Sequence, residues 1–293
     1  MNKKYIVFDC DCTFGVENCD VDDGLALMYL LGCEEAKVLG VTATYGNNSL
    51  PVVWKALHTL LCDLEREDIP VKRGGETKGE YESEASDFLV EMANRYPGKL
   101  SVLATGSLTN LCGAYEKDNL FFHKVKEIVL MGGITSPLVF EKKVMDELNF
   151  SCDPYASWCV LTKGENVSIV TGNNCLKVLF TRAEYRERLF KTENPAAVYI
   201  REKTDYWFGY NEEDYGIEGF YNWDVTAAVY LMHPELFADQ KEECRIAEAD
   251  LQTGFLNRTE KGMGNCILNL PQIREEMSFK NSIYDTWMKV PAK

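Results

Sequence analysis

Short apolar segments alternate with polar, small-residue turns along the first half of the chain, and each turn leads into a longer stretch with the composition of a helix. The segments have the length and apolar character of buried strands. The expected strands are residues 5–9, 36–44, 69–72, 99–104, 127–131 and 167–171. Strand, turn and helix repeated in this order are typical of βαβ units. We therefore predict an α/β fold, a doubly wound, mostly parallel sheet flanked by helices, in a single domain over residues 1–293.

The polar turns fall at the carboxyl ends of the expected strands. They contain Asp11, Asn47, the Thr105-Gly106 pair and the Gly132-Gly133 pair. In open α/β sheets, ligands bind outside this edge of the sheet. The turns therefore predict one site that is built from points far apart in the sequence.

Carboxylates are crowded at the first of these strand ends. Asp9 and Asp11 have the two-residue spacing that places side chains on the same side of a strand, and Asp22 and Asp23 begin an expected helix that continues through residues 25–31. Such carboxylates repel one another, and a helix dipole offsets only about 0.3–1 kcal/mol per charge. A hard divalent cation, which prefers oxygen ligands, offsets far more. The alternative is a solvated acidic turn that caps the helix, although such a turn rarely follows so apolar a strand.

Two later segments carry further candidate chemistry. Glu147 and Asn149 have the same two-residue spacing, and a carboxylate beside an amide can hold vicinal hydroxyls. Capping of the following helix is the alternative for this segment, and it is the preferred interpretation for Asp153. Asp224 precedes an apolar helix at residues 225–231. It is either the N-cap of that helix or a fourth carboxylate at the cation.

Composition narrows the possible partners and location. The net charge of −15 argues against nucleic acid and anionic membrane surfaces as partners. The eleven cysteines are scattered without CxxC pairs, which indicates reduced thiols in a reducing compartment. No signal peptide or membrane-spanning run is visible, so we expect a cytoplasmic protein.

Taken in order along the chain, these motifs resemble the calcium-dependent, inosine-uridine-preferring nucleoside hydrolase family. The motifs that carry the resemblance are the aspartates at positions 9, 11, 22 and 23, Gly46-Asn47, the turn at residues 104–110, Leu130-Met131-Gly132-Gly133, Glu147-Leu148-Asn149 with Asp153-Pro154, and Trp223-Asp224. Each motif is weak alone, and together in this order they are specific.

The resemblance implies an enzyme that hydrolyses the N-glycosidic bond of ribonucleosides to free base and ribose, a role in purine salvage, and a homodimer or homotetramer. It also implies a role for each of the following residues. The calcium ligands would be Asp11, Asp23, Asp224 and the Leu130 carbonyl. The ribose contacts would be Asp22, Asn47, Glu147 and Asn149, and Asp11 would be the general base that accepts a proton from calcium-activated water.

The chain also departs from the family pattern. Ten residues, 12–21, separate Asp11 from the Asp22-Asp23 pair, where the family's motif is much shorter. This insertion must loop out, and Glu17 or Asp20 could then approach the site. The amide expected before Glu147 is absent, and Glu141 lies nearby.

The position before the last calcium aspartate often holds His in the family, whereas this chain has Trp223. An indole cannot act as a general acid near neutral pH, but it can stack on a base. We therefore expect a preference for purines. Aromatic residues between 206 and 221 could supply the other wall of the base site.

Two other classes of protein remain as alternatives. Residues 8–13 fit the opening motif of haloacid-dehalogenase-like magnesium phosphatases, but the later Gly-Asp element of that fold is missing, and Met131-Gly132-Gly133 would be unexplained. A calcium-dependent nucleoside- or sugar-binding protein without catalysis is made conceivable by the insertion and by the missing His. The intact Asp11 argues against it.

Overall fold

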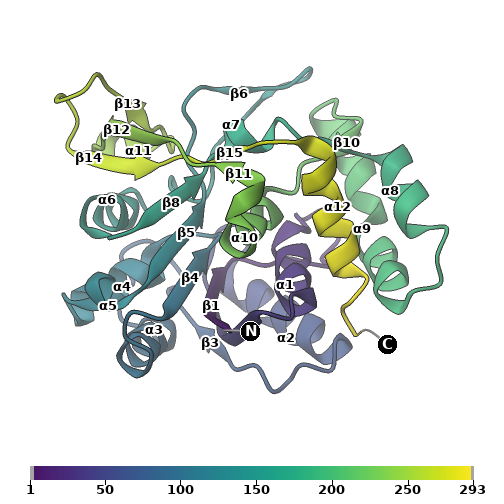
Figure 1. The fold of residues 1–293 in the computed structure, drawn as a ribbon, viewed down its shortest axis with the longest axis horizontal. Coiled ribbons are helices and arrows are strands. Elements are labelled where there is room, and N and C mark those ends of the chain that lie inside the picture. Colours follow the sequence, from purple (N-terminus) through teal and green to yellow (C-terminus); the bar gives the residue numbers. More distant parts are fainter. Residues whose placement is uncertain (1–2, 292–293) are drawn as a thin grey trace.

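A nine-stranded sheet runs through the computed structural model, which describes residues 3–291, in the order β13-β12-β14-β8-β5-β4-β1-β2-β3 (Figure 1). Six parallel strands form the centre of this sheet, and they are added on both sides of the first strand of the chain. They are β1 (Lys4–Cys10), β2 (Ala36–Ala43), β3 (Val71–Arg73), β4 (Leu100–Ala104), β5 (Glu127–Met131) and β8 (Val167–Val170). All six predicted strands are present, and the doubly wound arrangement is confirmed.

The far edge of the sheet makes it mixed. Strand β14 (Cys266–Asn269) is parallel to β8, whereas β12 (Lys241–Arg245) is antiparallel to both of its neighbours, β14 and β13 (Asn257–Arg258). The remaining short strands form three two-stranded pairs. They are β6 (Leu138–Val139) with β7 (Val144–Met145), β9 (Phe180–Thr181) with β10 (Gly219–Phe220), and β11 (Phe237–Ala238) with β15 (Gln272–Ile273).

Helices cover both faces of the sheet, because its central strands are apolar on both sides (Figure 1). Ile6 and Phe8 belong to the core on one face, and Val7 belongs to the core on the other. The first face is covered by α1 (Asp22–Gly32), α2 (Leu50–Asp63), α9 (Pro195–Asp214), α10 (Trp223–Met232) and α12 (Glu276–Trp287). The second is covered by α3 (Glu84–Arg95), α4 (Thr109–Lys117), α5 (Phe121–Lys124) and α6 (Pro154–Lys163). Shorter helices are α7 (Gly172–Cys175), α8 (Arg182–Leu189) and α11 (Glu248–Leu251), with one 3₁₀ turn, η1 (Pro234–Leu236).

The helix starts test two capping predictions. Asp153 caps α6, since its Oδ1 accepts a hydrogen bond from the Ala156 amide at 3.1 Å, as predicted. Asp224 does not cap α10. The N-cap is Asn222, and Asp224 lies inside the first turn, where its side chain is free to serve the site. No helix within residues 3–291 has the length and apolar character needed to span a bilayer.

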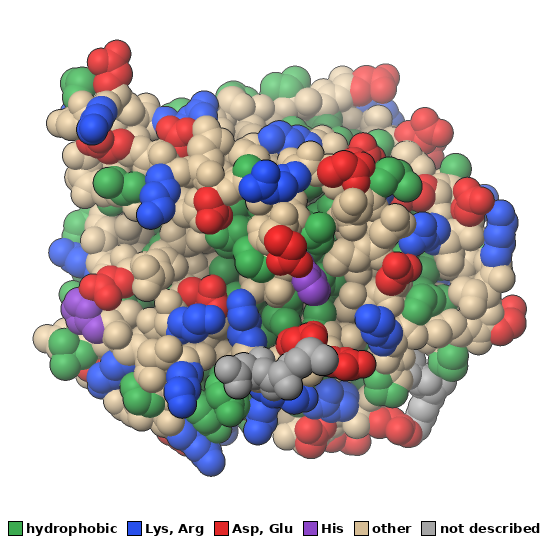
Figure 2. Space-filling view, in the orientation of Figure 1, with side chains coloured by type: hydrophobic (Ala, Val, Ile, Leu, Met, Phe, Trp, Pro, Cys, Tyr) green, Lys and Arg blue, Asp and Glu red, His purple; other side chains and the backbone are tan. Residues whose placement is uncertain are grey.

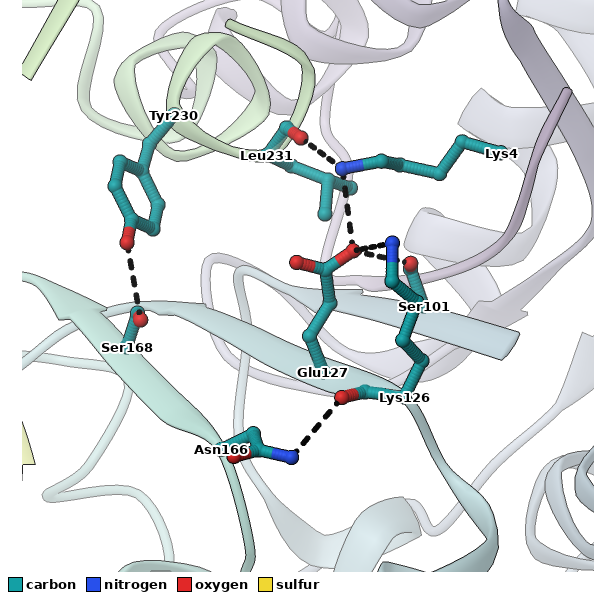
Figure 3. A network of polar contacts seen from close by, with 8 residues as sticks. All are labelled: Lys4, Ser101, Lys126, Glu127, Asn166, Ser168, Tyr230 and Leu231. Carbon is teal, nitrogen blue, oxygen red and sulfur yellow. Dashed lines mark hydrogen bonds and ion pairs between the residues drawn. The ribbon is translucent and has the colours of Figure 1, made fainter. Parts of the chain in front are cut away.

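A network of ion pairs and hydrogen bonds lies at the amino ends of the central strands (Figure 3). Lys4 forms an ion pair with Glu127 at 3.1 Å, and Ser101 Oγ donates to the same Glu127 oxygen at 2.7 Å. Burial raises the pKa of Glu127, but these donors and Lys126 outweigh it and hold the pKa below its usual value. Charge is therefore compensated at this edge of the sheet. The face of the molecule in Figure 2 likewise shows acidic and basic side chains intermingled.

Candidate active site

Asp9 and Asp11 stand at the carboxyl end of β1, and only Asp11 is held by a predicted site residue. Asp9 Oδ1 accepts hydrogen bonds from Thr42 Oγ1 at 2.5 Å and from Asn110 Nδ2 at 2.8 Å. Its other oxygen, Oδ2, is buried without a partner, and burial raises the pKa of Asp9 to about 7. Asp9 thus ties β1 to β2 and to the start of α4, away from the cavity described below.

Asp11 accepts hydrogen bonds from the turn that follows β2. The Asn47 amide donates to Asp11 Oδ2 at 2.5 Å, and Asn47 Nδ2 lies 3.4 Å from Oδ1. The turn can approach so closely because residue 46 is glycine, where an added Cβ would lie 2.0 Å from Asp11 Oδ2. Burial raises the pKa of Asp11 to about 6. The turn therefore fixes the direction in which this carboxylate points.

The first turns of α1 and α10 meet beside Asp11 and bring three further carboxylates together. The Asp224 amide donates to Asp22 Oδ2 at 2.9 Å, and Thr105 Oγ1 donates to Asp23 Oδ1 at 2.6 Å. Asp23 Oδ2 is buried without a hydrogen-bond partner. The structure thus joins residues that are two hundred positions apart in the sequence.

These carboxylates lack a compensating positive charge. Burial, and after it the neighbouring carboxylates, hold the pKa values of Asp23 and Asp224 well above the usual range, and burial also raises the pKa of Asp22. Among the described residues, no Lys or Arg lines the adjacent cavity. The contrast with the paired charges at the amino edge shows that the negative charge is concentrated at the carboxyl edge.

This donor set fits a hard cation. Carboxyl groups that touch, as Asp11 touches Asp23 and Asp22 touches Asp224, must share either a proton or a positive ion. The unpartnered Asp23 Oδ2 offers such an ion a further oxygen. Within residues 3–291, no group of three or more His, Cys, Asp or Glu side chains is already arranged to hold a metal ion. A cation would thus replace the pairwise contacts between the carboxyl groups.

A cavity of about 270 Å³ opens directly above the carboxylates. Six of the residues singled out from the sequence line it: Asp22, Asn47, Glu147, Asn149, Trp223 and Asp224. Asp11 and Asp23 are buried just behind this lining, in contact with Asn47 and Thr105 respectively. The structure therefore assembles all but one of the predicted site residues at a single place.

The exception is Leu130, whose predicted carbonyl contact with the cation stays a prediction. Leu130 lies within the sheet, paired with Ala104 on one side and Ile169 on the other, and it does not line the cavity. Its side chain belongs to the core on the opposite face of the sheet. Thr105 lines the cavity instead and touches Asp23. The motif at residues 104–110 contained this residue, but nothing in the sequence distinguished its role.

Glu147 and Asn149 line the cavity while also holding its walls. The Glu147 carboxylate accepts hydrogen bonds from the amides of Gly133 at 2.9 Å, Phe150 at 2.9 Å and Ser151 at 3.0 Å. Asn149 Nδ2 donates to the Met131 carbonyl at 3.0 Å. Each side chain thus joins the end of β5 to the segment before α6. A ribose contact by these residues would use their remaining acceptor capacity.

Aromatic residues form another part of the lining. Trp207 and Tyr210 of α9 are stacked with ring centroids 4.7 Å apart, and Trp223 lies 5.1 Å from Tyr221. Asn211, which the sequence did not single out, also lines the cavity, and its Nδ2 is committed to the Trp207 carbonyl at 2.9 Å. The side chains of His58, His123 and His233 all lie outside the lining.

Three further acidic residues were expected near the site: Glu17 and Asp20 in the insertion, and Glu141. Asp20 lines the cavity, whereas Glu17 and Glu141 do not. Glu141 sits on the β6–β7 hairpin beside Gly216. The same hairpin is fastened to the end of α9 by Lys142 Nζ, which donates to the Glu212 and Glu213 carbonyls at 2.7 and 2.9 Å.

Gly46→Ala is expected to lower turnover by about 10–100-fold, because the new methyl group must displace either the Asp11 carboxylate or the Asn47 turn, and small misplacements of reacting groups carry costs of this size. Steady-state kinetics with a ribonucleoside measures the loss. Gly209→Ala on α9 is the control for replacement of a glycine, since its Cβ would meet only the end of the Arg182 side chain, at an ordinary contact distance of 3.8 Å. Normal turnover of Gly46→Ala would show that the position of Asp11 is not critical.

The fold and the cavity define an α/β enzyme that acts on a small molecule at the carboxyl edge of its sheet. The chain belongs to the inosine-uridine preferring nucleoside hydrolase family, whose model matches residues 6–268. It is a ribonucleoside hydrolase, an enzyme that cleaves N-glycosidic bonds of nucleosides.

Individual relatives carry different names. A probable uridine nucleosidase 2 from Oryza sativa subsp. japonica is 28% identical over 257 residues, which cover 77% of this chain and 75% of the relative. Among solved structures, a plant nucleoside hydrolase, PpNRh1, superimposes with a TM-score of 0.84 at 22% identity, covering 97% of this chain and 99% of that one. A purine-preferring ribonucleoside hydrolase from Gardnerella vaginalis has a TM-score of 0.84 at 20% identity, covering 98% of each chain. The two structures confirm the fold.

Proposed function

We propose that this enzyme hydrolyses ribonucleosides, with a preference for purines, by means of a calcium ion and Asp11 as general base. The observation that carries the proposal is the cluster of four buried carboxylates, Asp11, Asp22, Asp23 and Asp224, beside a cavity that is also lined by stacked aromatic rings. Carboxylates suit a cation and sugar hydroxyls, whereas aromatic rings suit a nucleobase.

The calcium ion would be held by Asp11, Asp23, Asp224 and the Leu130 carbonyl, and Thr105 lies beside Asp23. Calcium takes six to eight oxygen ligands, so water and sugar hydroxyls would complete the set. Bound calcium would make a coordinated water more acidic. Asp22 accepts a hydrogen bond from the Asp224 amide and lines the cavity, where it could also accept one from a ribose hydroxyl.

Asp11 is the candidate base because its direction is fixed. Two contacts from Asn47 orient the carboxylate, so it can accept a proton from a water held beside it. Asp22 and Asn47, together with Glu147 and Asn149, would hold the ribose. The surrounding negative charge favours the positive charge that develops on the sugar as the bond breaks.

The leaving base is proposed to stack on Trp223. The residue directly precedes Asp224 in the first turn of α10, so its ring lines the cavity next to the sugar site. Stacking of a base on an aromatic ring contributes about 1–3 kcal/mol, and a bicyclic purine offers more area than a pyrimidine. The aromatic residues Trp207 and Tyr210 supply further surface in the same cavity.

A panel of ribonucleosides, assayed for free base and free ribose, tests the proposed function. We expect both products from inosine, adenosine or guanosine at higher kcat/KM than from uridine or cytidine. A nucleoside 5′-phosphate is the matched control. Its phosphate would meet no Lys or Arg side chain in the lining, so it should be a poor substrate. Magnesium-dependent release of phosphate from it would instead support the phosphatase alternative.

Trp223→Ala is expected to lower kcat/KM for inosine by about 5–150-fold, the equivalent of the stacking energy, and to lower it less for uridine. The measurement is kcat/KM for both substrates with the wild type and the variant. Trp158→Ala on α6 is a suitable control, because this Trp lies outside the cavity lining. Equal losses on inosine and uridine, or faster hydrolysis of uridine by the wild type, would contradict stacking as the source of a purine preference.

A further inference from the structure

The insertion between β1 and α1, residues 12–21, is an ordered loop that is anchored at its start. Thr13 Oγ1 donates to the Asp20 carbonyl at 2.8 Å and closes the base of the loop. Phe14 is 4% exposed and rests on Gly24, where an added Cβ would lie 2.3 Å from the Phe14 side chain. The Phe14 ring also contacts Tyr199 of α9 at 5.9 Å between centroids. The insertion is therefore packed onto α1 and α9.

A second set of contacts fixes the tip of the insertion. The Tyr206 hydroxyl, also on α9, lies 2.8 Å from the Val16 carbonyl and 2.9 Å from the Cys19 carbonyl. On the other side of the tip, Asn48 Nδ2 lies 3.6 Å from Cys19 Sγ. The insertion thus bridges α9 and the turn that contains Asn47. Tyr206 is the residue that holds both carbonyls in place.

The fixed tip faces the cavity. Asn18, Cys19 and Asp20 all line it, together with Trp207 and Tyr210, which flank Tyr206 on the same helix. Asp20 is itself oriented, because its Oδ1 accepts from the Val21 amide at 2.6 Å. Glu147 and Asn149, the proposed ribose contacts, are instead held by the end of β5 and the turn after it. Asp20 Oδ1 also accepts from the Asp22 amide at 3.3 Å, so the tip lies between the aromatic part of the lining and the carboxylates.

We propose that the tip of the insertion, Asn18 to Asp20, forms part of the nucleobase site, and that Tyr206 is the positioning residue that sets which base this enzyme accepts. The inference rests on the proposed ribonucleoside substrate. A polar tip beside two stacked rings provides hydrogen-bonding groups for the edge of a base whose face lies on the aromatic surface. The segment acts on base selection, while the carboxylates and Asn47 act on the sugar and on the bond that breaks.

Two variants test this assignment. Tyr206→Phe removes only the hydroxyl that holds the tip, and Asn18→Gly removes a side chain of the tip without strain, because Asn18 has a φ of +63° that glycine adopts freely. The control is Tyr199→Phe on the same helix, whose hydroxyl bonds to Asp63 at 2.9 Å and whose ring contact with Phe14 is retained.

The readouts are KM and kcat for inosine and uridine, and the inhibition constant of free ribose. Tyr206→Phe and Asn18→Gly should each raise KM for at least one nucleoside by about 3–10-fold, the equivalent of one lost hydrogen bond, and change the inosine-to-uridine ratio of kcat/KM. The ribose constant and kcat should stay within about twofold, as should every parameter of Tyr199→Phe.

Unchanged KM values in both variants, or an equal change in the constants for inosine, uridine and ribose, would overturn the inference and leave the insertion a purely structural role. A wild-type protein that releases ribose from no nucleoside would overturn the proposed function instead. In that case, calorimetric titration with inosine, uridine and ribose compares the variants with the wild type by their binding alone. The absence of any difference between the variants and the wild type in that titration would overturn the inference as well.

Discussion

Asp11→Asn is expected to lower the turnover of ribonucleosides by about 10²–10⁴-fold or more, the loss associated with removal of a general base. The same carboxylate is a proposed calcium ligand, so the substitution removes a proton acceptor and one negative charge from the ion. The Asn side chain has almost the same shape, and its carbonyl oxygen can still accept from the Asn47 amide. Single-turnover kinetics with saturating calcium separates loss of chemistry from loss of metal.

The fold of the Asp11→Asn variant should survive. One carboxylate fewer in a buried cluster reduces the repulsion that raises the pKa values of its neighbours, so thermal unfolding of the metal-free variant should occur at the same temperature as in the wild type or above it. Asp9→Asn is the matched control on the same strand. Its carbonyl oxygen can still accept from Thr42 and Asn110 in place of Oδ1, so the variant should fold and should retain much more activity. Turnover of Asp11→Asn within tenfold of the wild type, with calcium bound, would assign the base to another residue.

Removal of calcium with a selective chelator should abolish hydrolysis and lower the unfolding temperature. The four carboxylates line a buried edge of the sheet without a basic neighbour, so they repel one another unless protons or an ion join them. An ion that binds only the folded state stabilises it by about 2.7 kcal/mol at a concentration of 100 times Kd. Elemental analysis measures the loss of calcium. Calorimetry measures the unfolding temperature of the same samples, and a nucleoside assay measures their activity.

Re-addition supplies the control for the chelator experiment. Calcium should restore both activity and unfolding temperature, whereas magnesium should restore little, because it demands a small octahedral shell that this set of carboxylates does not present. Asp23→Asn should weaken calcium binding, since Asp23 carries the buried oxygen that has no protein partner. Full activity after chelation, in protein shown to contain no metal, would rule out a metal-assisted reaction.

The sequence alone determined the central strands and the positions of several site residues at their ends. Six strands were predicted from short apolar runs, and the polar turns at their ends located Asp11, Asn47, Thr105 and Gly133 on one edge of the sheet. This succeeded because the face and the end of an element on which a residue lies depend on its immediate neighbours in the chain. The acidic, polar segment at residues 76–87 reads as a surface loop, yet α3 begins within it at Glu84, because Ser83 caps the helix.

Only the tertiary structure decided which of these residues meet. Asp224, predicted as either an N-cap or a ligand, lies inside its helix and donates its amide to Asp22. Leu130 shares a motif with cavity residues, yet its side chain belongs to the core on the opposite face of the sheet, whereas Thr105 lines the cavity. The insertion carries no motif at all, and it reaches the cavity because Tyr206 holds it there. Periodicity records the direction of a side chain relative to its own element. Which side chains of other elements it contacts depends on how the elements pack together, and that packing is determined by the whole core.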